Sequence, residues 1–296
     1  MVGEVASVGG MSAHEAFLLL FSEALGVHST DGAEDGAFFQ EYVVPSVMPM
    51  DTGSYRENPY YRNIRIPTVS DGRWDLKTEH WEPYHCFVRD DLWVGPDLKE
   101  LPLLGYFTES FDFPAVLEDG REWMMVTPNE VETIRPAVNA ARGKVVTFGL
   151  GLGYFAYMVS EKPEVSQVTV VEKDPSVIRL FNHYILPQFG HPEKVTIVEE
   201  DAFRWAEKVL PRENYDYAYA DTWHDAQDGV PMYCRMKRLE LLSPQTRFDY
   251  WVEETLLSYI RSEVYEELLK GTLRSDDWAR TLSGPALKEW VKKKPA

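Results

Sequence analysis

Residues 144–153 read Lys-Val-Val-Thr-Phe-Gly-Leu-Gly-Leu-Gly, and this run constrains the fold more than any other part of the chain. Val145 to Phe148 favour a β-strand, and glycines follow at positions 149, 151 and 153. The apolar residues from Tyr154 to Val159 suit one face of a helix. A strand, a glycine turn and a helix bring backbone N–H groups and a helix N-terminus up to a ligand. The run therefore predicts a nucleotide-type cofactor site.

Strands and helices alternate from this run onward. The sequence predicts strands over 144–148, 168–171, 195–198 and 217–220, with a later strand over 248–252. It predicts helices over 153–161, 175–186, 202–209 and 254–269, the second of them capped by Asp174. Alternation at this spacing is typical of βαβ units. We therefore expect an α/β fold with a doubly wound, mostly parallel sheet.

The residues before the glycine run are less regular. Residues 1–12 are small and Gly-rich, so we expect them to be poorly ordered. Ser12, with Glu15 three residues later, predicts a capped helix that ends at Leu25. From Thr30 to about Leu101 the chain is rich in aromatic residues and prolines without sustained periodicity. We interpret this stretch as an irregular but folded accessory region.

A hairpin and a helix lead into the glycine run. Asp119-Gly120 predicts the turn of a hairpin over 111–126. Thr127 is a predicted helix cap, and Glu130 completes a capping box. We therefore divide the chain into an N-terminal accessory region, 1–120, and a Rossmann-like domain, 121–296, with a C-terminal helix and a solvated basic tail at 292–294.

Composition narrows the function class. The chain has 296 residues with a formal net charge of −18, which disfavours nucleic acid as a partner. Its two cysteines support neither a disulfide framework nor a Cys-based metal site, and we predict no metal. The longest apolar run, 16–21, is too short to span a bilayer, and no signal peptide is recognisable. We expect a cytoplasmic protein with a small-molecule substrate and no membrane partner, and a homodimer is an assembly that the sequence allows.

Acidic residues follow the later strands. Glu172 ends the second strand, Asp201-Ala202 follows the third, and Asp221 ends the fourth. The carboxyl ends of parallel strands meet at one edge of a sheet, where ligands bind. A dinucleotide fold would place its third glycine at position 154, which is tyrosine. The spacing here is G-x-G-x-G.

This combination resembles the class I S-adenosylmethionine-dependent methyltransferases over about residues 125–225. The resemblance implies a seven-stranded-type sheet and binding of S-adenosyl-L-methionine, with S-adenosyl-L-homocysteine as product. Gly149, Gly151 and Gly153 would surround the amino-acid portion of the cofactor. The resemblance further implies that Glu172, with Lys173 beside it, holds the ribose, that Asp201 and Ala202 hold the adenine, and that Asp221 lines the reaction chamber.

Each of these residues also has a structural interpretation. The glycines can serve helix–strand packing, Glu172 can simply end a strand, and Asp201 can be a helix cap. Asn129 and Glu130 lie on the helix expected to cover the methionine end of the cofactor, where they can contact the ligand or cap the helix. The aromatic residues of the accessory region can line a substrate pocket, although most are assigned to its core; they are Tyr60, Tyr61, Trp74, Trp81, Tyr84 and Trp93.

Asp221 and His224 are the candidate catalytic residues, to orient the nucleophile and to accept a proton. A structural role for His224 remains open. We expect methyl transfer to an N or O nucleophile of a small molecule. The chain is also similar to the spermidine synthases, which transfer an aminopropyl group, but Asp221-Thr-Trp-His-Asp225 stands where that family has Asp-Ser-Ser-Asp-Pro. A non-catalytic cofactor-binding protein is the third alternative.

Overall fold

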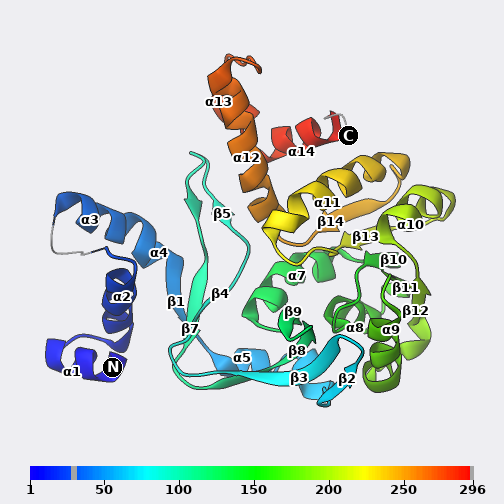
Figure 1. Ribbon diagram of the computed structural model, residues 1–296, viewed down its shortest axis with the longest axis horizontal. Coiled ribbons are helices and arrows are strands. Elements are labelled where there is room, and N and C mark those ends of the chain that lie inside the picture. The colour runs from blue at the N-terminus through cyan, green and yellow to red at the C-terminus, as the bar shows by residue number, and fades with distance from the viewer. Residues whose placement is uncertain (28–31, 294–296) are drawn as a thin grey trace.

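A computed structural model describes residues 1–27 and 32–293. A five-stranded parallel sheet, in the order β12-β11-β10-β13-β14, forms one end of the molecule, and the N-terminal helices form the other (Figure 1). The strands of this sheet are β10 (Gly143–Phe148), β11 (Val165–Glu172), β12 (Val195–Glu199), β13 (Tyr217–Ala220) and β14 (Arg247–Tyr250). The order places the first strand in the centre, as in a doubly wound Rossmann-like fold. The predicted count of seven is not confirmed, since the sheet that the described residues form has five strands.

Helices cover both faces of this sheet. One face packs against α7 (Pro128–Ala140), α8 (Tyr154–Ser160) and α9 (Pro175–Leu180). The other face packs against α10 (Ala202–Lys208), α11 (Ala226–Leu239), α12 (Glu253–Lys270) and α14 (Gly284–Lys293), with α13 (Trp278–Thr281) leading into α14. Strand side chains alternate between the faces, so Val145 joins the first core and Val146 the second. A strand buried on both faces reads as a continuous apolar run, which is how β10 appears in the sequence.

Three further sheets make up the region before α7. The predicted hairpin is confirmed as β8 (Phe111–Glu118) and β9 (Arg121–Met125), and β2 (Val69–Asp71) and β3 (Trp74–Trp81) extend it in the order β2-β3-β8-β9. A second sheet has the order β1-β7-β4, and a third pairs β5 with β6. Their strands are β1 (Val47–Met50), β4 (Cys86–Val88), β5 (Trp93–Val94), β6 (Glu100–Leu101) and β7 (Leu104–Phe107). The predicted boundary at residue 120 falls in the turn of the β8–β9 hairpin.

The N-terminal helices correct one expectation and confirm another. Residues 1–12 are not simply disordered, because α1 (Val2–Gly9) packs through Val2 against α2 (Ala13–Ala24). The capping box predicted for α2 is confirmed, with Ser12 and Glu15 exchanging backbone hydrogen bonds. The next helices are α3 (Ala33–Phe38), α4 (Val44–Ser46), α5 (Thr52–Arg56) and α6 (Pro59–Asn63). Thr30, where the irregular stretch was predicted to begin, lies outside the described residues.

The predicted helix over 175–186 changes type along its length. Asp174 caps it as expected, accepting from the N–H groups of Ser176 and Val177. It is α-helical to Leu180 and continues as a π-helix from Phe181 to Ile185. Short 3₁₀ turns follow this segment and occur elsewhere between elements.

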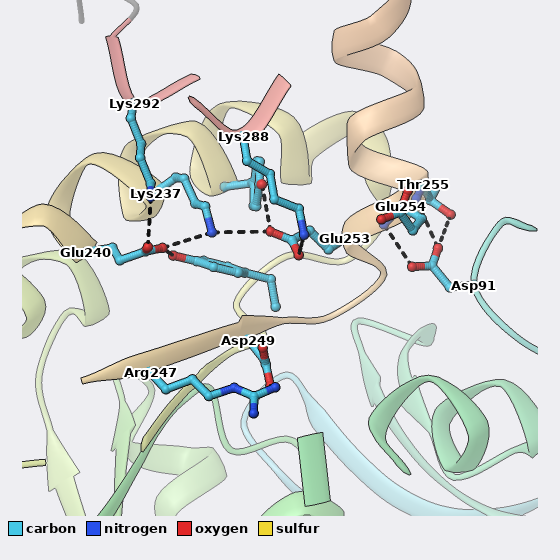
Figure 2. A network of polar contacts seen from close by, with 12 residues as sticks. Asp91, Lys237, Glu240, Arg247, Asp249, Glu253, Glu254, Thr255, Lys288 and Lys292 are labelled. Atoms are coloured by element: carbon cyan, nitrogen blue, oxygen red, sulfur yellow. Dashed lines mark hydrogen bonds and ion pairs between the residues drawn. The ribbon is translucent and has the colours of Figure 1, made fainter. Parts of the chain in front are cut away.

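Ion pairs tie the C-terminal helix α14 to the end of α11 and the start of α12 (Figure 2). Lys237 is 6% exposed and lies 2.9 Å from Glu240 and 3.4 Å from Glu253. Lys288 and Lys292 of α14 pair with the same two carboxylates, at 2.6 and 3.3 Å. The prediction of a solvated basic tail is therefore wrong for Lys292, whose ammonium shares a carboxylate with Lys237. Lys294 lies outside the described residues.

Helix α12 is also tied to the accessory region. Asp91 accepts hydrogen bonds from the backbone N–H groups of Glu254 and Thr255, at 2.9 and 3.0 Å, and so caps the first turn of α12 (Figure 2). Farther along the helix, Arg261 pairs with Glu100. Residues more than 150 positions apart in sequence are thus joined around one helix.

In the described part of the chain, no single helix is long and apolar enough to cross a membrane. Helices α1 and α2, bent by 112° at their junction, pass that test of length and composition only as a pair.

Candidate active site

The ends of three adjacent strands place the predicted residues at one edge of the sheet. Phe148, the last residue of β10, is in register with Val171 of β11 and Ala220 of β13. The residue that follows in each strand is a predicted site residue, namely Gly149, Glu172 or Asp221. These three residues therefore lie side by side at the edge of the sheet. Parallel pairing alone brings about this convergence.

A cavity of about 420 Å³ opens at this edge. Most of the predicted site residues line it, namely Asn129, Gly149, Gly151, Glu172, Lys173, Asp201, Ala202, Asp221 and His224. Glu172 and Asp201 therefore face one common space. Its volume is in the range of small-molecule sites.

A different structural constraint excludes a side chain at each of the three glycine positions. Gly149 has φ +99°, and a Cβ there would lie 1.9 Å from the carbonyl oxygen of Asp221, so it permits close approach of two strand ends. Gly151 has φ +50°, and its Cβ would lie 2.1 Å from the Met124 sulfur on the β8–β9 hairpin. Gly153 is not among the described residues that line the cavity, because it faces the Phe181 ring, 2.3 Å from where its Cβ would be. Packing is thus the role that the structure gives Gly153.

Glu172 organises the backbone around it. One carboxylate oxygen accepts from the N–H of Leu150, in the glycine loop, at 3.2 Å, and the other accepts from the N–H of Asp174 at 2.8 Å. Burial raises the pKa of Glu172. Each carboxylate oxygen can accept a second hydrogen bond, so the side chain keeps capacity for ligand hydroxyl groups.

Asp201 caps α10 through the N–H of Arg204, at 2.9 Å, so the capping interpretation is confirmed. Its side chain is exposed, whereas Ala202 is buried. A capping carboxylate at a cavity wall retains an oxygen for a ligand, together with the N–H groups of the first helical turn.

Two further carboxyl groups line the cavity, those of Glu130, which is buried, and Asp221, which is partly buried. Burial raises the pKa of Asp221 to about 7, and its remaining accessible surface faces the cavity. Glu130 of α7 is 5% exposed, and burial together with the charge of Asp221 raises its pKa well above the usual range. The predicted capping box is therefore wrong. Glu130 turns inward, one of its oxygens has no hydrogen-bond partner among the described residues, and the Thr127 side chain makes no capping bond there either.

Sequence reasoning did not identify Tyr219 of β13. Its side chain lines the cavity near Asp221 and Glu130, whose charges help to raise its pKa. Its hydroxyl is buried and lacks a hydrogen-bond partner within residues 1–27 and 32–293. The available signal was a tyrosine two residues before a strand-end aspartate, on the same face of the strand.

His224 joins the cavity wall to the hairpin above it. Its Nε2 lies 2.7 Å from the carbonyl oxygen of Glu122 in β9, so this nitrogen carries a proton and donates it. Its Nδ1 lies 3.4 Å from Asp225 and from Arg121. These contacts engage both ring nitrogens of His224. They favour a structural role for this residue over a role as general base.

Positive charge is confined to one part of the cavity. Among the described residues, the lysine and arginine side chains that line it are Arg73 and Lys173. Arg73 pairs with Glu118 at 2.7 Å and with Asp174, two residues after Glu172, at 3.3 Å. The end that holds Asp221 and Glu130 is therefore acidic.

No family model matches the chain, and no curated protein matches it. Among solved structures it is similar to a spermidine synthase from Thermotoga maritima, with 16% identity and a TM-score of 0.34 over 45% of this chain and 50% of that one. It is also similar to a spermidine synthase in complex with the transition state analogue AdoDATO, with 16% identity and a TM-score of 0.32 over 44% and 47% of the two chains. A probable spermidine synthase from Corynebacterium glutamicum ATCC 13032 gives 18% identity and a TM-score of 0.32 over 42% and 51%.

The chain spans about half the length of these three synthases. Structural similarity at TM-scores of 0.32 to 0.34 does not indicate a shared activity. The strand order shows a mixed α/β protein with a Rossmann-like parallel sheet. A cavity opens at the carboxyl edge of that sheet.

Proposed function

We propose that this protein is a transferase that alkylates an amine from an adenosyl sulfonium donor, and that the donor is decarboxylated S-adenosylmethionine. The observation that carries the proposal is the acidic end of the cavity. Glu130 is buried and Asp221 is partly buried, and of the two lining cations Arg73 pairs with Glu118 and Asp174 instead of with these acids.

The charge of this end discriminates between two donors. S-adenosylmethionine has a carboxylate on its tail, which opposes ionisation of two acids whose pKa values burial already raises, whereas a cationic tail favours their ionised forms. The decarboxylated donor has an aminopropyl tail that ends in an ammonium, which such acids attract. Aminopropyl transfer is therefore the reaction that this cavity supports best.

The remaining residues fit an adenosyl group. Glu172 has free acceptor capacity for ribose hydroxyls, and Asp201 with the N–H of Ala202 can read an adenine edge. Gly149 and Gly151 keep the backbone open where a side chain would fill the space. When bound, the donor supplies an electrophilic carbon attached to a positively charged sulfur.

The chain's own groups then position the acceptor and take up its proton. An amine nitrogen held at Asp221 forms a bond to that carbon as the carbon–sulfur bond breaks, which leaves a neutral thioether. The nitrogen loses one proton, and Asp221, with a pKa of about 7, is suited to accept it at neutral pH. We therefore assign one carboxylate oxygen of Asp221 to orient and deprotonate the acceptor and the other to the donor tail, and His224 as a support of the cavity wall.

Methyl transfer is the second candidate. It is favoured by the segment after β13, where Asp221-Thr-Trp-His-Asp225 departs from the spermidine synthase pattern. S-adenosyl-L-methionine would then be the cofactor and S-adenosyl-L-homocysteine the product.

Titration calorimetry with decarboxylated adenosylmethionine, adenosylmethionine and adenosylhomocysteine tests the proposal. We expect the decarboxylated donor to bind at least about tenfold more tightly than the other two, and a panel of diamines to yield aminopropylated products by mass spectrometry. Tighter binding of adenosylmethionine with a methylated product would replace this proposal by methyl transfer. Tight binding without turnover of any amine would favour a non-catalytic protein. The variant Glu130→Gln, which removes one acid from the proposed tail site, should lose the donor preference.

A further inference from the structure

We propose that the hydroxyl of Tyr219 is a ligand-binding group, and that Tyr219, Glu130 and Asp221 together bind a primary ammonium. The proposed function supplies the ligand that carries this ammonium, and in that respect the inference rests on it. The evidence for Tyr219 itself comes from its own strand.

Tyr217 and Tyr219 form a matched pair. They lie two residues apart on β13, so they point to the same face of the sheet, and each is 1% exposed. The Tyr217 hydroxyl donates to a carboxylate oxygen of Asp249, at 2.5 Å. The Tyr219 hydroxyl has no partner in the described chain. Because buried hydroxyl groups are normally paired, this one calls for an explanation.

Packing fixes the Tyr219 hydroxyl where it is. The ring stacks on Phe155 of α8, with centroids 4.4 Å apart and an interplanar angle of 23°. The side chain is one of those that line the cavity, so the unpaired, buried hydroxyl belongs to the cavity wall. A phenylalanine would fill the same core position without burying an unpaired hydroxyl.

The chemistry of the surrounding groups indicates a cation. Glu130 is also nine-tenths buried, and one of its oxygens is without a partner among the residues described. Asp221 lines the same cavity as Glu130 and Tyr219, and its charge acts on both of them. A primary ammonium has three N–H donors, and two carboxylates with one phenol oxygen supply three acceptors. The phenol proton can point to a carboxylate while its oxygen accepts from the ammonium.

Two adenosyl probes test whether the Tyr219 hydroxyl binds an ammonium, because only one of them carries this group. Decarboxylated adenosylmethionine carries the ammonium, and methylthioadenosine lacks it. In the variant Tyr219→Phe, we expect affinity for the decarboxylated donor to fall about 10- to 100-fold, and affinity for methylthioadenosine to change less than about twofold. The control Tyr217→Phe should leave both affinities near those of the wild type. Equal loss for both probes in Tyr219→Phe, or no loss for either, would overturn the inference.

Unfolding of the ligand-free protein provides the second measurement. Tyr217→Phe breaks a hydrogen bond to Asp249 and should lower the melting temperature by about 2–4 °C. Tyr219→Phe removes an unpaired hydroxyl and should leave the melting temperature equal or higher. A lower melting temperature for Tyr219→Phe than for Tyr217→Phe would show that the hydroxyl has a structural partner and would overturn the inference.

The failure of the proposed function has a separate signature. If the wild type binds neither adenosyl probe, the function fails, and the ammonium site is then tested with 1,3-diaminopropane alone. Protection of the wild type from thermal unfolding by this diamine, without protection of Tyr219→Phe, supports the site. Equal effects on both proteins would reject it.

Discussion

Replacing Asp221 by asparagine should stabilise the ligand-free protein at neutral and alkaline pH. Burial raises the pKa of this carboxyl from its usual 3.8 to about 7. The folded protein therefore keeps a proton that the unfolded chain releases between pH 4 and pH 7. In this window stability falls as pH rises, and above pH 7 the full cost of the buried carboxylate is present. An asparagine has nearly the same shape and does not ionise.

The size of the effect follows from the two pKa values. One pH unit corresponds to about 1.36 kcal/mol, so a rise from 3.8 to about 7 costs at most about 4 kcal/mol. Water in the cavity screens part of this, because the carboxyl faces that space. We expect Asp221→Asn to unfold with a free energy about 2–4 kcal/mol higher than the wild type at pH 8, and with nearly the same free energy at pH 4.

Urea unfolding at pH 4, 6 and 8 measures this difference. The variant should gain stability progressively with pH while losing affinity for the decarboxylated donor. Asp249→Asn is the matched control, because Asp249 accepts a hydrogen bond from Tyr217 and has an ion pair with Arg247. A pH-independent difference for Asp221→Asn, or a variant less stable than the wild type at pH 8, would refute the reasoning.

Three further substitutions test other parts of the structure. Gly149→Ala places a Cβ 1.9 Å from a backbone carbonyl oxygen at a positive φ, and should cost more than about 3 kcal/mol in urea unfolding; a loss under 1 kcal/mol would contradict this. His224→Gln can still donate to the Glu122 carbonyl and should leave the pH–rate profile unchanged between pH 5.5 and 7.5, whereas loss of a titration there would restore His224 as a base. Lys237→Met leaves Glu240 and Glu253 with only Lys292 and Lys288 as ion-pair partners and should cost about 2 kcal/mol, against less than about 1 kcal/mol for Lys270→Met at an exposed ion pair; equal losses would contradict the role of burial.

Residues at strand ends were predictable because local patterns determine them. The apolar run before Gly149 and the acid after each later strand are enough to expect that Glu172 and Asp221 converge. Glu130 was misassigned because the sequence S/T-x-x-E is the same for a capping box and for an inward-facing acid. Only the packing of α7 against the sheet distinguishes the two.

Other features depend on contacts between distant residues, which no local pattern contains. Strand β1 pairs in parallel with β7, in a register that joins Val47 to Leu104, so neither strand can be recognised alone. Tyr219 lies in the short strand Tyr-Ala-Tyr-Ala, where its position two residues before Asp221 is the one local feature that separates it from Tyr217. The difference between their hydroxyl groups appears only in the folded protein, where that of Tyr217 donates to Asp249 and that of Tyr219 has no partner among the described residues.

The cap that Asp91 places on α12 has a consequence for how this protein is made. The acceptor for the first N–H groups of that helix is synthesised some 160 residues before the helix itself. On a ribosome, the early segment must wait for nearly the whole polypeptide before this contact can form. A fragment that starts after residue 120 would carry α12 with its first turn exposed to water, and we expect it to fray at Glu254 and Thr255, next to Trp251 in the cavity wall.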